Sequence, residues 1–91
     1  MLEEILRRLF VDAFTKLYGQ EPPVQMVNFQ KTRPEFEGDM TIVVFPFVKM
    51  AKKSPEIIAD EIGKEMLGNS EIISKYNVVK GFLNLLVSDQ Y

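Results

Sequence analysis

The chain has 91 residues, of which 46% are hydrophobic and 26% are charged, as expected for one small globular domain. It contains no cysteine and no histidine, which excludes disulfides, thiolate zinc sites, cysteine nucleophiles and Ser-His-Asp triads within these residues. The formal net charge of −2 is not typical of a nucleic-acid-binding protein, although it permits a local basic face.

The N-terminus and the apolar runs argue against a membrane partner. The first residues are acidic and lack the basic and apolar regions of a secretion signal. The longest apolar run, residues 42–48 with Pro46 counted, is far shorter than the ~20 residues that span a bilayer. We therefore expect a cytoplasmic protein.

The first part of the chain predicts a helix followed by a strand. Apolar residues recur at the spacing of a buried helix face from Leu2 to Leu17, and Gly19 favours termination. Pro22 and Pro23 prevent the helix from continuing. Residues 24–30 alternate loosely and predict a strand.

The next segments predict a loop and a second strand. Residues 31–39 are polar and contain Pro34 and Gly38, which indicates a loop. Residues 40–45 are mostly β-branched or aromatic and predict a strand. Because apolar residues fall on both of its faces, we expect an inner strand covered on both sides, or one covered by a partner domain.

Two helices and two strands are predicted for the rest of the chain. Residues 47–53 predict a short helix, and a longer one starts with Ser54 as N-cap and Pro55 at its first position. Residues 71–75 are ambiguous. Strands are then predicted at residues 77–79 and 82–87, joined by a tight turn at Lys80 and Gly81.

This order of elements predicts an α+β fold for a single domain spanning residues 1–91. A two-layer arrangement satisfies it, with helices on one face of a four-stranded antiparallel sheet in the order α-β-β-α-β-β. No Walker loop, G-x-G-x-x-G or H-E-x-x-H motif occurs, so no catalytic site and no metal site is expected.

Two groups of charged residues are candidates for function. The acidic residues Glu35, Glu37 and Asp39 fit no EF-hand spacing, and a solvated loop is the favoured interpretation. The basic residues either form a solvated face or contact phosphates. This second group comprises Lys31, Arg33, Lys49, Lys52 and Lys53.

Phe82 and Asn84 lie two positions apart and would share one face of a strand. An aromatic ring and an amide on one face can stack on a base and hydrogen-bond its edge. On the pattern alone, a core Phe beside a solvent-facing Asn is the favoured alternative.

Four sequence blocks occur in an order that resembles the N-terminal additional domain of arginyl-tRNA synthetases. In that family an F-G-D-like turn precedes a helix ending in A-K-K, a P-x-x-I/L-A-x-x-I helix and a G-F-I-N-like strand. The resemblance covers nearly the whole chain, up to Ser88. The blocks are Phe36-Glu37-Gly38-Asp39, Ala51-Lys52-Lys53, Pro55 with Ile58-Ala59-Asp60-Glu61-Ile62, and Gly81-Phe82-Leu83-Asn84.

The resemblance implies an α-β-β-α-β-β core that binds the D-loop at the outer corner of the tRNA for arginine. The family's aromatic and amide residues correspond by motif to Phe82 and Asn84. It also makes this chain an N-terminal fragment whose partner is the catalytic domain of the same protein. ATP and arginine would bind that missing part, so no cofactor is expected here. The candidate tRNA contacts are Phe82, Asn84, Gly81, Lys80, Lys52 and Lys53, with Lys31, Arg33 and Lys49 as further candidates for phosphate contact.

Two other functions stay open from the sequence. The first is a protein-interaction module with no RNA partner, in which residues 42–48 form an exposed apolar face. The second is a small hydrolase of ferredoxin-like shape, which is the weakest because the sequence offers no recognisable pair of nucleophile and base.

Overall fold

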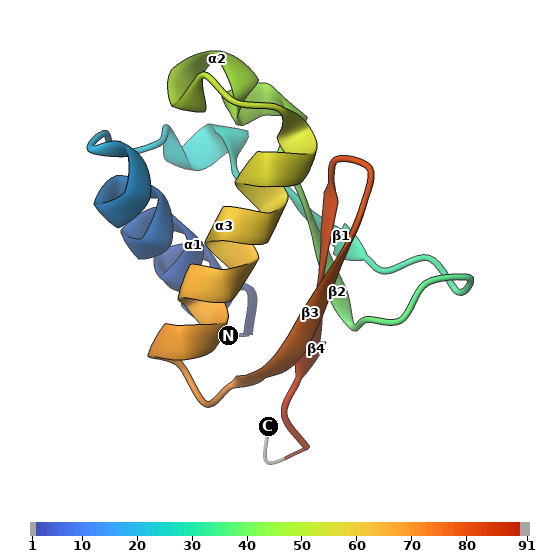
Figure 1. Cartoon of the computed structure of the whole chain (residues 1–91). Coiled ribbons are helices and arrows are strands. Elements are labelled where there is room, and N and C mark those ends of the chain that lie inside the picture. Colours follow the sequence, from blue (N-terminus) through green and yellow to red (C-terminus); the bar gives the residue numbers. More distant parts are fainter. Residues whose placement is uncertain (1, 90–91) are drawn as a thin grey trace.

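Helices α1 (Leu2–Tyr18) and α3 (Pro55–Asn69) lie on one face of an antiparallel sheet (Figure 1). The computed structural model describes residues 2–89. The sheet has four strands in the order β1-β2-β4-β3, which confirms the predicted α+β fold. Within the described residues, no helix has both the length and the apolarity to cross a membrane.

The end of α1 and the start of α3 lie where the sequence predicts them, at Gly19 and Ser54. Helix α1 ends where the Gly19 amide donates to the Thr15 carbonyl at 2.9 Å, with Gly19 at a φ of 70°. Helix α3 starts at Ser54, whose Oγ accepts a hydrogen bond from the Ile57 amide at 3.4 Å. A short helix, α2 (Val48–Ala51), precedes it, as predicted.

The strand predicted for residues 24–30 is wrong over most of its length. The 3-10 helix η1 (Val24–Met26) forms instead, because the Pro23 carbonyl accepts from the Met26 amide at 3.0 Å and closes a tight turn. The Met26 amide is therefore hydrogen-bonded within the turn and is not available to pair with a neighbouring strand. Strand β1 (Phe29–Lys31) begins after it and includes Lys31, for which the sequence predicts a loop.

Strand β2 (Met40–Val43) ends two residues earlier than predicted. The chain then turns into the 3-10 helix η2 (Phe45–Phe47), whose second residue is Pro46. Proline has no amide hydrogen to donate to a neighbouring strand, so pairing stops before it. Strand β2 is nevertheless an inner strand, as predicted, with β1 on one side and β4 on the other.

The C-terminal hairpin joins β3 (Ile73–Val79) to β4 (Phe82–Val87), and the predicted turn at Lys80 and Gly81 is confirmed. Strand β3 also includes most of the segment that was ambiguous in the sequence. The pairing sets Asn84 opposite Asn77 on β3 and opposite Thr41 on β2. These three polar residues therefore share the sheet face opposite the helices.

The hydrophobic core fills the space between the helices and the sheet. Three aromatic rings form its centre, with Phe47 lying 5.2 Å from Phe10 and 5.3 Å from Phe14 between ring centroids. From the sheet, the fully buried Leu83 and Leu85 point into this core. Alternation along β4 therefore places Phe82 and Asn84 on the other face.

Gly63 marks the closest approach of α3 to the sheet and provides a test of the packing. A Cβ atom there would lie 2.6 Å from Tyr76 Cδ2 and 2.9 Å from Leu83 Cδ1. We expect Gly63→Ala to lower the free energy of unfolding by ~1–3 kcal/mol, because the added methyl group overpacks the interface. Urea unfolding followed by circular dichroism measures this change.

Gly68→Ala is the matched control in the same helix. No heavy atom lies within 4 Å of the position its Cβ would occupy. Alanine should there raise stability by ~0.5–1 kcal/mol through helix propensity. Equal changes in the free energy of unfolding for the two substitutions would contradict the close packing of Gly63 against Tyr76 and Leu83.

Candidate nucleic-acid interface

Phe82 stands at the start of β4, directly after the hairpin turn, and is half-buried. The ring of Phe45 meets it edge-on, with 5.7 Å between centroids and an interplanar angle of 80°. The guanidinium of Arg33 lies over the Phe82 ring, 5.7 Å from its centroid. A Cβ on Gly81 would lie 2.4 Å from Phe45 Cζ, so a glycine is needed for this ring to lie against the turn.

Asn84 is only 1% exposed, so the expected solvent-facing alternative for this residue is wrong. Its Oδ1 accepts from the Thr41 hydroxyl at 2.5 Å, and its Nδ2 donates to Asn77 Oδ1 at 2.9 Å. Asn77 Nδ2 donates in turn to the Glu37 carbonyl at 2.6 Å. The Thr32 and Thr41 hydroxyls are 2.8 Å apart, and Thr32 must be the donor because the Thr41 proton points to Asn84.

These contacts orient the Asn84 amide and leave part of its hydrogen-bonding capacity unused. An asparagine amide can donate two hydrogen bonds and accept two. The contacts within residues 2–89 use one donor hydrogen and one acceptor lone pair. One hydrogen and one lone pair therefore remain, fixed in direction by Thr41 and Asn77.

Residues 32–39 cover this part of the sheet, and we call them the covering loop. A Cβ on Gly38 would lie 2.9 Å from Thr32 Oγ1 and 3.2 Å from Asn84 Cβ, so the loop backbone approaches the sheet closely there. At its end the Asp39 amide donates to the Leu85 carbonyl at 2.7 Å, and Asp39 Oδ2 accepts from the Val87 amide at 2.7 Å.

Two of the three acidic residues of the covering loop help to attach it to the sheet. Glu37 forms an exposed ion pair with Lys75 at 3.4 Å, while Asp39 extends the pairing along β4. Residues 2–89 contain no group of three acidic, histidine or cysteine side chains that could hold a metal ion. The loop is thus fastened to β3 and β4 at its C-terminal end.

A cavity of about 10 Å³ lies between the covering loop and the sheet. It has about the volume needed to hold one water molecule. The residues that line the cavity are Gln30, Arg33, Phe36, Thr41, Phe82 and Asn84. The structure therefore brings Phe82 and Asn84, two of the predicted tRNA contacts, together with Arg33, a predicted phosphate contact.

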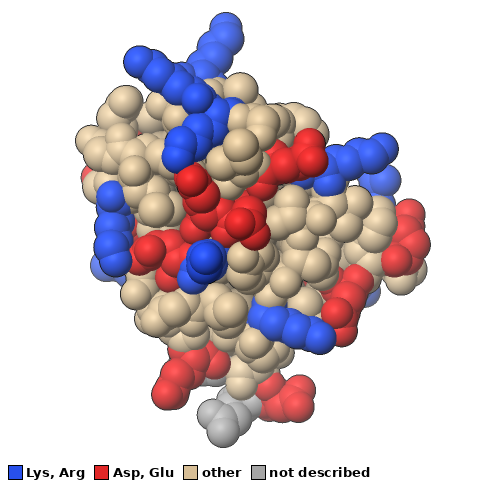
Figure 2. All heavy atoms as spheres, viewed as in Figure 1, with Lys and Arg blue, Asp and Glu red and all other residues tan. Residues whose placement is uncertain are grey.

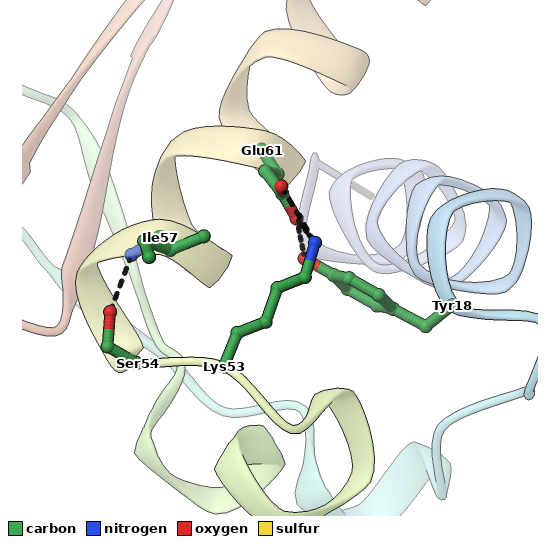
Figure 3. A network of polar contacts seen from close by, with 5 residues as sticks. All are labelled: Tyr18, Lys53, Ser54, Ile57 and Glu61. Atoms are coloured by element: carbon green, nitrogen blue, oxygen red, sulfur yellow. Dashed lines mark hydrogen bonds and ion pairs between the residues drawn. The ribbon is translucent and has the colours of Figure 1, made fainter.

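Lys53 lies in the helix layer, away from this cavity. Its Nζ pairs with Glu61 Oε2 at 2.9 Å and lies 5.6 Å from the centroid of the Tyr18 ring, between α1 and α3 (Figure 3). The hydrogen bond from Lys53 lowers the pKa of Glu61. Burial, together with the hydrogen bond to Glu61, raises the pKa of Tyr18.

Lys52 and Lys80 share an unusual backbone conformation. They have φ values of 57° and 56° and are the non-glycine residues with positive φ in the described part of the chain. Lys52 ends α2, and Lys80 forms the hairpin turn beside Phe82. Both side chains are exposed, as are those of Lys31 and Lys49.

Acidic and basic side chains are interspersed on the face of the molecule shown in Figure 2, with several Asp and Glu side chains across its middle.

The segment 42–48, which was expected to form an exposed apolar face, is mostly buried. Ile42, Val44 and Phe47 are fully buried in the core, and Phe45 is 48% exposed.

The sequence interpretation missed Thr32, Thr41 and Asn77. One signal could have found Asn77, since a two-residue turn at Lys80 and Gly81 pairs residue 77 with residue 84. No local signal identifies Thr32 or Thr41, because their contacts depend on how the covering loop folds back.

Comparisons with known proteins agree with the four sequence blocks. Residues 4–87 match the family model described as the arginyl tRNA synthetase N terminal domain. The arginine–tRNA ligase of Bacteroides thetaiotaomicron is 47% identical over 87 residues, covering 96% of this chain and 15% of the ligase. That of Phocaeicola vulgatus is 51% identical over 88 residues, covering 96% and 14%.

A solved structure shows the same fold. The arginyl-tRNA synthetase of Thermus thermophilus matches with a TM-score of 0.80 at 22% identity, covering 99% of this chain and 14% of that one. The chain thus spans about 15% of the length of the curated relatives it matches. The resemblance and the fold expected from the sequence are both confirmed.

Thr41→Val tests the hydrogen bonds around Asn84. Valine has a similar shape but leaves Asn84 Oδ1 without its buried donor, so the free energy of unfolding should fall by ~1–3 kcal/mol. Thr15→Val is the control, since the Thr15 hydroxyl is exposed and bonds only within its helix, to the Val11 carbonyl. It should change stability by less than ~0.5 kcal/mol in the same urea titration.

The raised pKa of Tyr18 predicts that the domain loses stability in alkaline solution. A tyrosine in the unfolded chain loses its proton near pH 10, whereas folding raises the pKa of Tyr18. Its contribution is therefore complete below pH 10 and declines as the pH rises above it. Urea unfolding from pH 8 to about pH 11 should show a shallower decline for Tyr18→Phe than for the wild type. Parallel declines would exclude this source of pH dependence.

Proposed function

The chain belongs to the family of arginyl-tRNA synthetase N-terminal domains, and from this we propose that it binds the D-loop of the tRNA for arginine. We propose further that it does so in the cytoplasm, as part of an arginine–tRNA ligase whose catalytic domain is its other partner. In this proposal the domain contributes a tRNA contact and the remainder of the ligase carries out the reaction.

The arrangement of Phe82 and Asn84 at one cavity is the observation that supports D-loop binding. RNA is read most readily at unstacked loop bases, which offer both a flat face and hydrogen-bonding edges. The half-buried Phe82 ring supplies a flat surface for the face of a base. The remaining hydrogen and lone pair of Asn84 supply the paired donor and acceptor that a base edge requires.

Phosphate contacts would come from exposed basic residues near this surface. Lys80 projects from the turn that leads into Phe82, and Gly81 keeps that turn close to Phe45. Lys31, at the end of β1, directly precedes the covering loop. A few such contacts are compatible with the net charge of −2, because local neutralisation of phosphates does not require a basic domain.

Lys49, Lys52 and Lys53 are proposed as contacts made at the other end of the interface. Lys49 and Lys52 are exposed. Lys53 would first have to leave Glu61, with which it is paired. Its share of the binding free energy should therefore be smaller than that of an unpaired lysine.

ATP and arginine are proposed to bind elsewhere in such a ligase. Residues 2–89 contain no glycine-rich loop leading into a helix, which is the usual cradle for nucleotide phosphates. The residues described here therefore lack that type of phosphate cradle, in agreement with ATP binding elsewhere in the ligase.

Phe82→Leu tests the proposed function. Leucine keeps most of the apolar volume against Phe45 but removes the aromatic face, so tRNA affinity should fall by the ~1–3 kcal/mol that a stacked base contributes. Fluorescence anisotropy with an arginine tRNA transcript measures the change. A transcript with a replaced D-loop should bind the wild type and the variant equally weakly.

Val24→Ala is the matched control. Val24 is an exposed apolar residue in η1 and is not among the proposed tRNA contacts, so its replacement should leave the affinity unchanged. Undiminished binding by Phe82→Leu, or equal binding of the two transcripts by the wild type, would refute the proposed D-loop contact.

A further inference from the structure

Arg33 already occupies the face of Phe82 that points into the cavity. Its guanidinium carbon lies 5.7 Å from the ring centroid, and both residues line the same space of about 10 Å³ together with Asn84. That space is too small for a nucleobase. A base that stacks on this face of Phe82 must therefore change the position of Arg33.

The backbone around Arg33 is built to hold it over the sheet. The Phe36 amide donates to the Arg33 carbonyl at 3.0 Å, closing a turn whose second residue is Pro34. On one side of this turn, Thr32 is bonded to Thr41, and on the other Gly38 packs against Thr32. Both ends of the turn are thus held against the sheet, and the side chain of Arg33, its first residue, extends over the Phe82 ring.

We propose that Arg33 forms the second wall of the nucleotide site, so that a D-loop base inserts between its guanidinium and the Phe82 ring. This proposal rests on the proposed function and adds a residue to it. In the structure the guanidinium lies over the ring with no room for a base between them. In the complex each of them contacts one face of the same base, and the edge of the base points to the Asn84 amide below.

Insertion of a base requires the two walls to separate. Stacked groups lie about 3.4 Å apart, so a base with a partner on each face needs about 7 Å between the planes of those partners. The Arg33 guanidinium carbon now lies 5.7 Å from the centroid of the Phe82 ring. The Arg33 side chain therefore has to move away from the ring.

The chemistry of the side chain favours arginine in this place. A guanidinium is planar, remains charged at neutral pH and stacks on aromatic faces, whereas a lysine ammonium is a compact point charge. A second wall therefore depends on the plane of the group as well as its charge. A simple phosphate contact depends mainly on the charge, and lysine would serve it.

The test compares Arg33→Lys, Arg33→Ala and Phe82→Leu in the 91-residue chain, with an arginine tRNA transcript as the probe. We expect Arg33→Lys to lower affinity about 3- to 30-fold, with the same salt dependence as the wild type because the charge is kept. Arg33→Ala should lower it at least as much. Lys64→Ala, an exposed change on α3, is the control and should leave affinity unchanged.

A double mutant gives a second measurement. If both walls hold the same base, Arg33→Lys should have little further effect once Phe82 is leucine. Nuclear Overhauser contacts from one base to both the Arg33 methylenes and the Phe82 ring would support the same conclusion. Circular dichroism melting of each variant verifies that the fold is retained.

The outcomes separate this inference from the proposed function. Affinity within about 2-fold of the wild type for Arg33→Lys, with a clear loss for Phe82→Leu, would overturn the second wall alone and make Arg33 a phosphate contact. Equal losses from Arg33→Lys in the wild-type and Phe82→Leu backgrounds would overturn it too. No loss for Phe82→Leu would remove the proposed function, and with it this inference.

Discussion

A continuous chain of hydrogen bonds on the sheet face opposite the helices is the constraint on which the rest of the candidate site depends. It runs from the Thr32 hydroxyl through Thr41, Asn84 and Asn77 to the Glu37 carbonyl. It crosses β2, β4 and β3, and it begins and ends on the covering loop. Because buried polar groups are stable only when they are paired, the two end links fix the loop relative to the strands, and the middle links join the strands to one another. The position of Arg33 over Phe82 follows from that attachment.

The helix layer gives this face its rigidity. Leu83 and Leu85 alternate with Phe82 and Asn84 along β4, so the strand that presents the site is anchored in the core on its other side. Gly63 lets α3 lie close against that strand and its neighbour. The polar chain and the apolar core thus hold opposite faces of one strand, which suits a site that must keep a ring and an amide in a fixed relation.

The parts of the fold that could be predicted are those governed by neighbours in sequence. Ser54 and Pro55 set the start of α3, and the turn at Lys80 set the hairpin, because caps and tight turns are local. The 3-10 helix at Val24–Met26 escaped prediction, since its residues suit a strand and the carbonyl of Pro23 decided otherwise. The burial of Asn84 escaped it too, because a loop about 50 residues earlier in the chain covers it.

Lys52 and Lys80, which have left-handed backbone conformations, are positions where stability and charge favour different residues. A non-glycine residue in this conformation destabilises the fold by about 1 kcal/mol or more, and glycine or asparagine would relieve that strain. Lys80 and Lys52 nevertheless occupy these positions. A population selected for heat resistance alone would be expected to replace them and lose positive charge there. Under the proposed function, selection for RNA affinity would retain both lysines, so the two selection pressures would act in opposite directions at these positions.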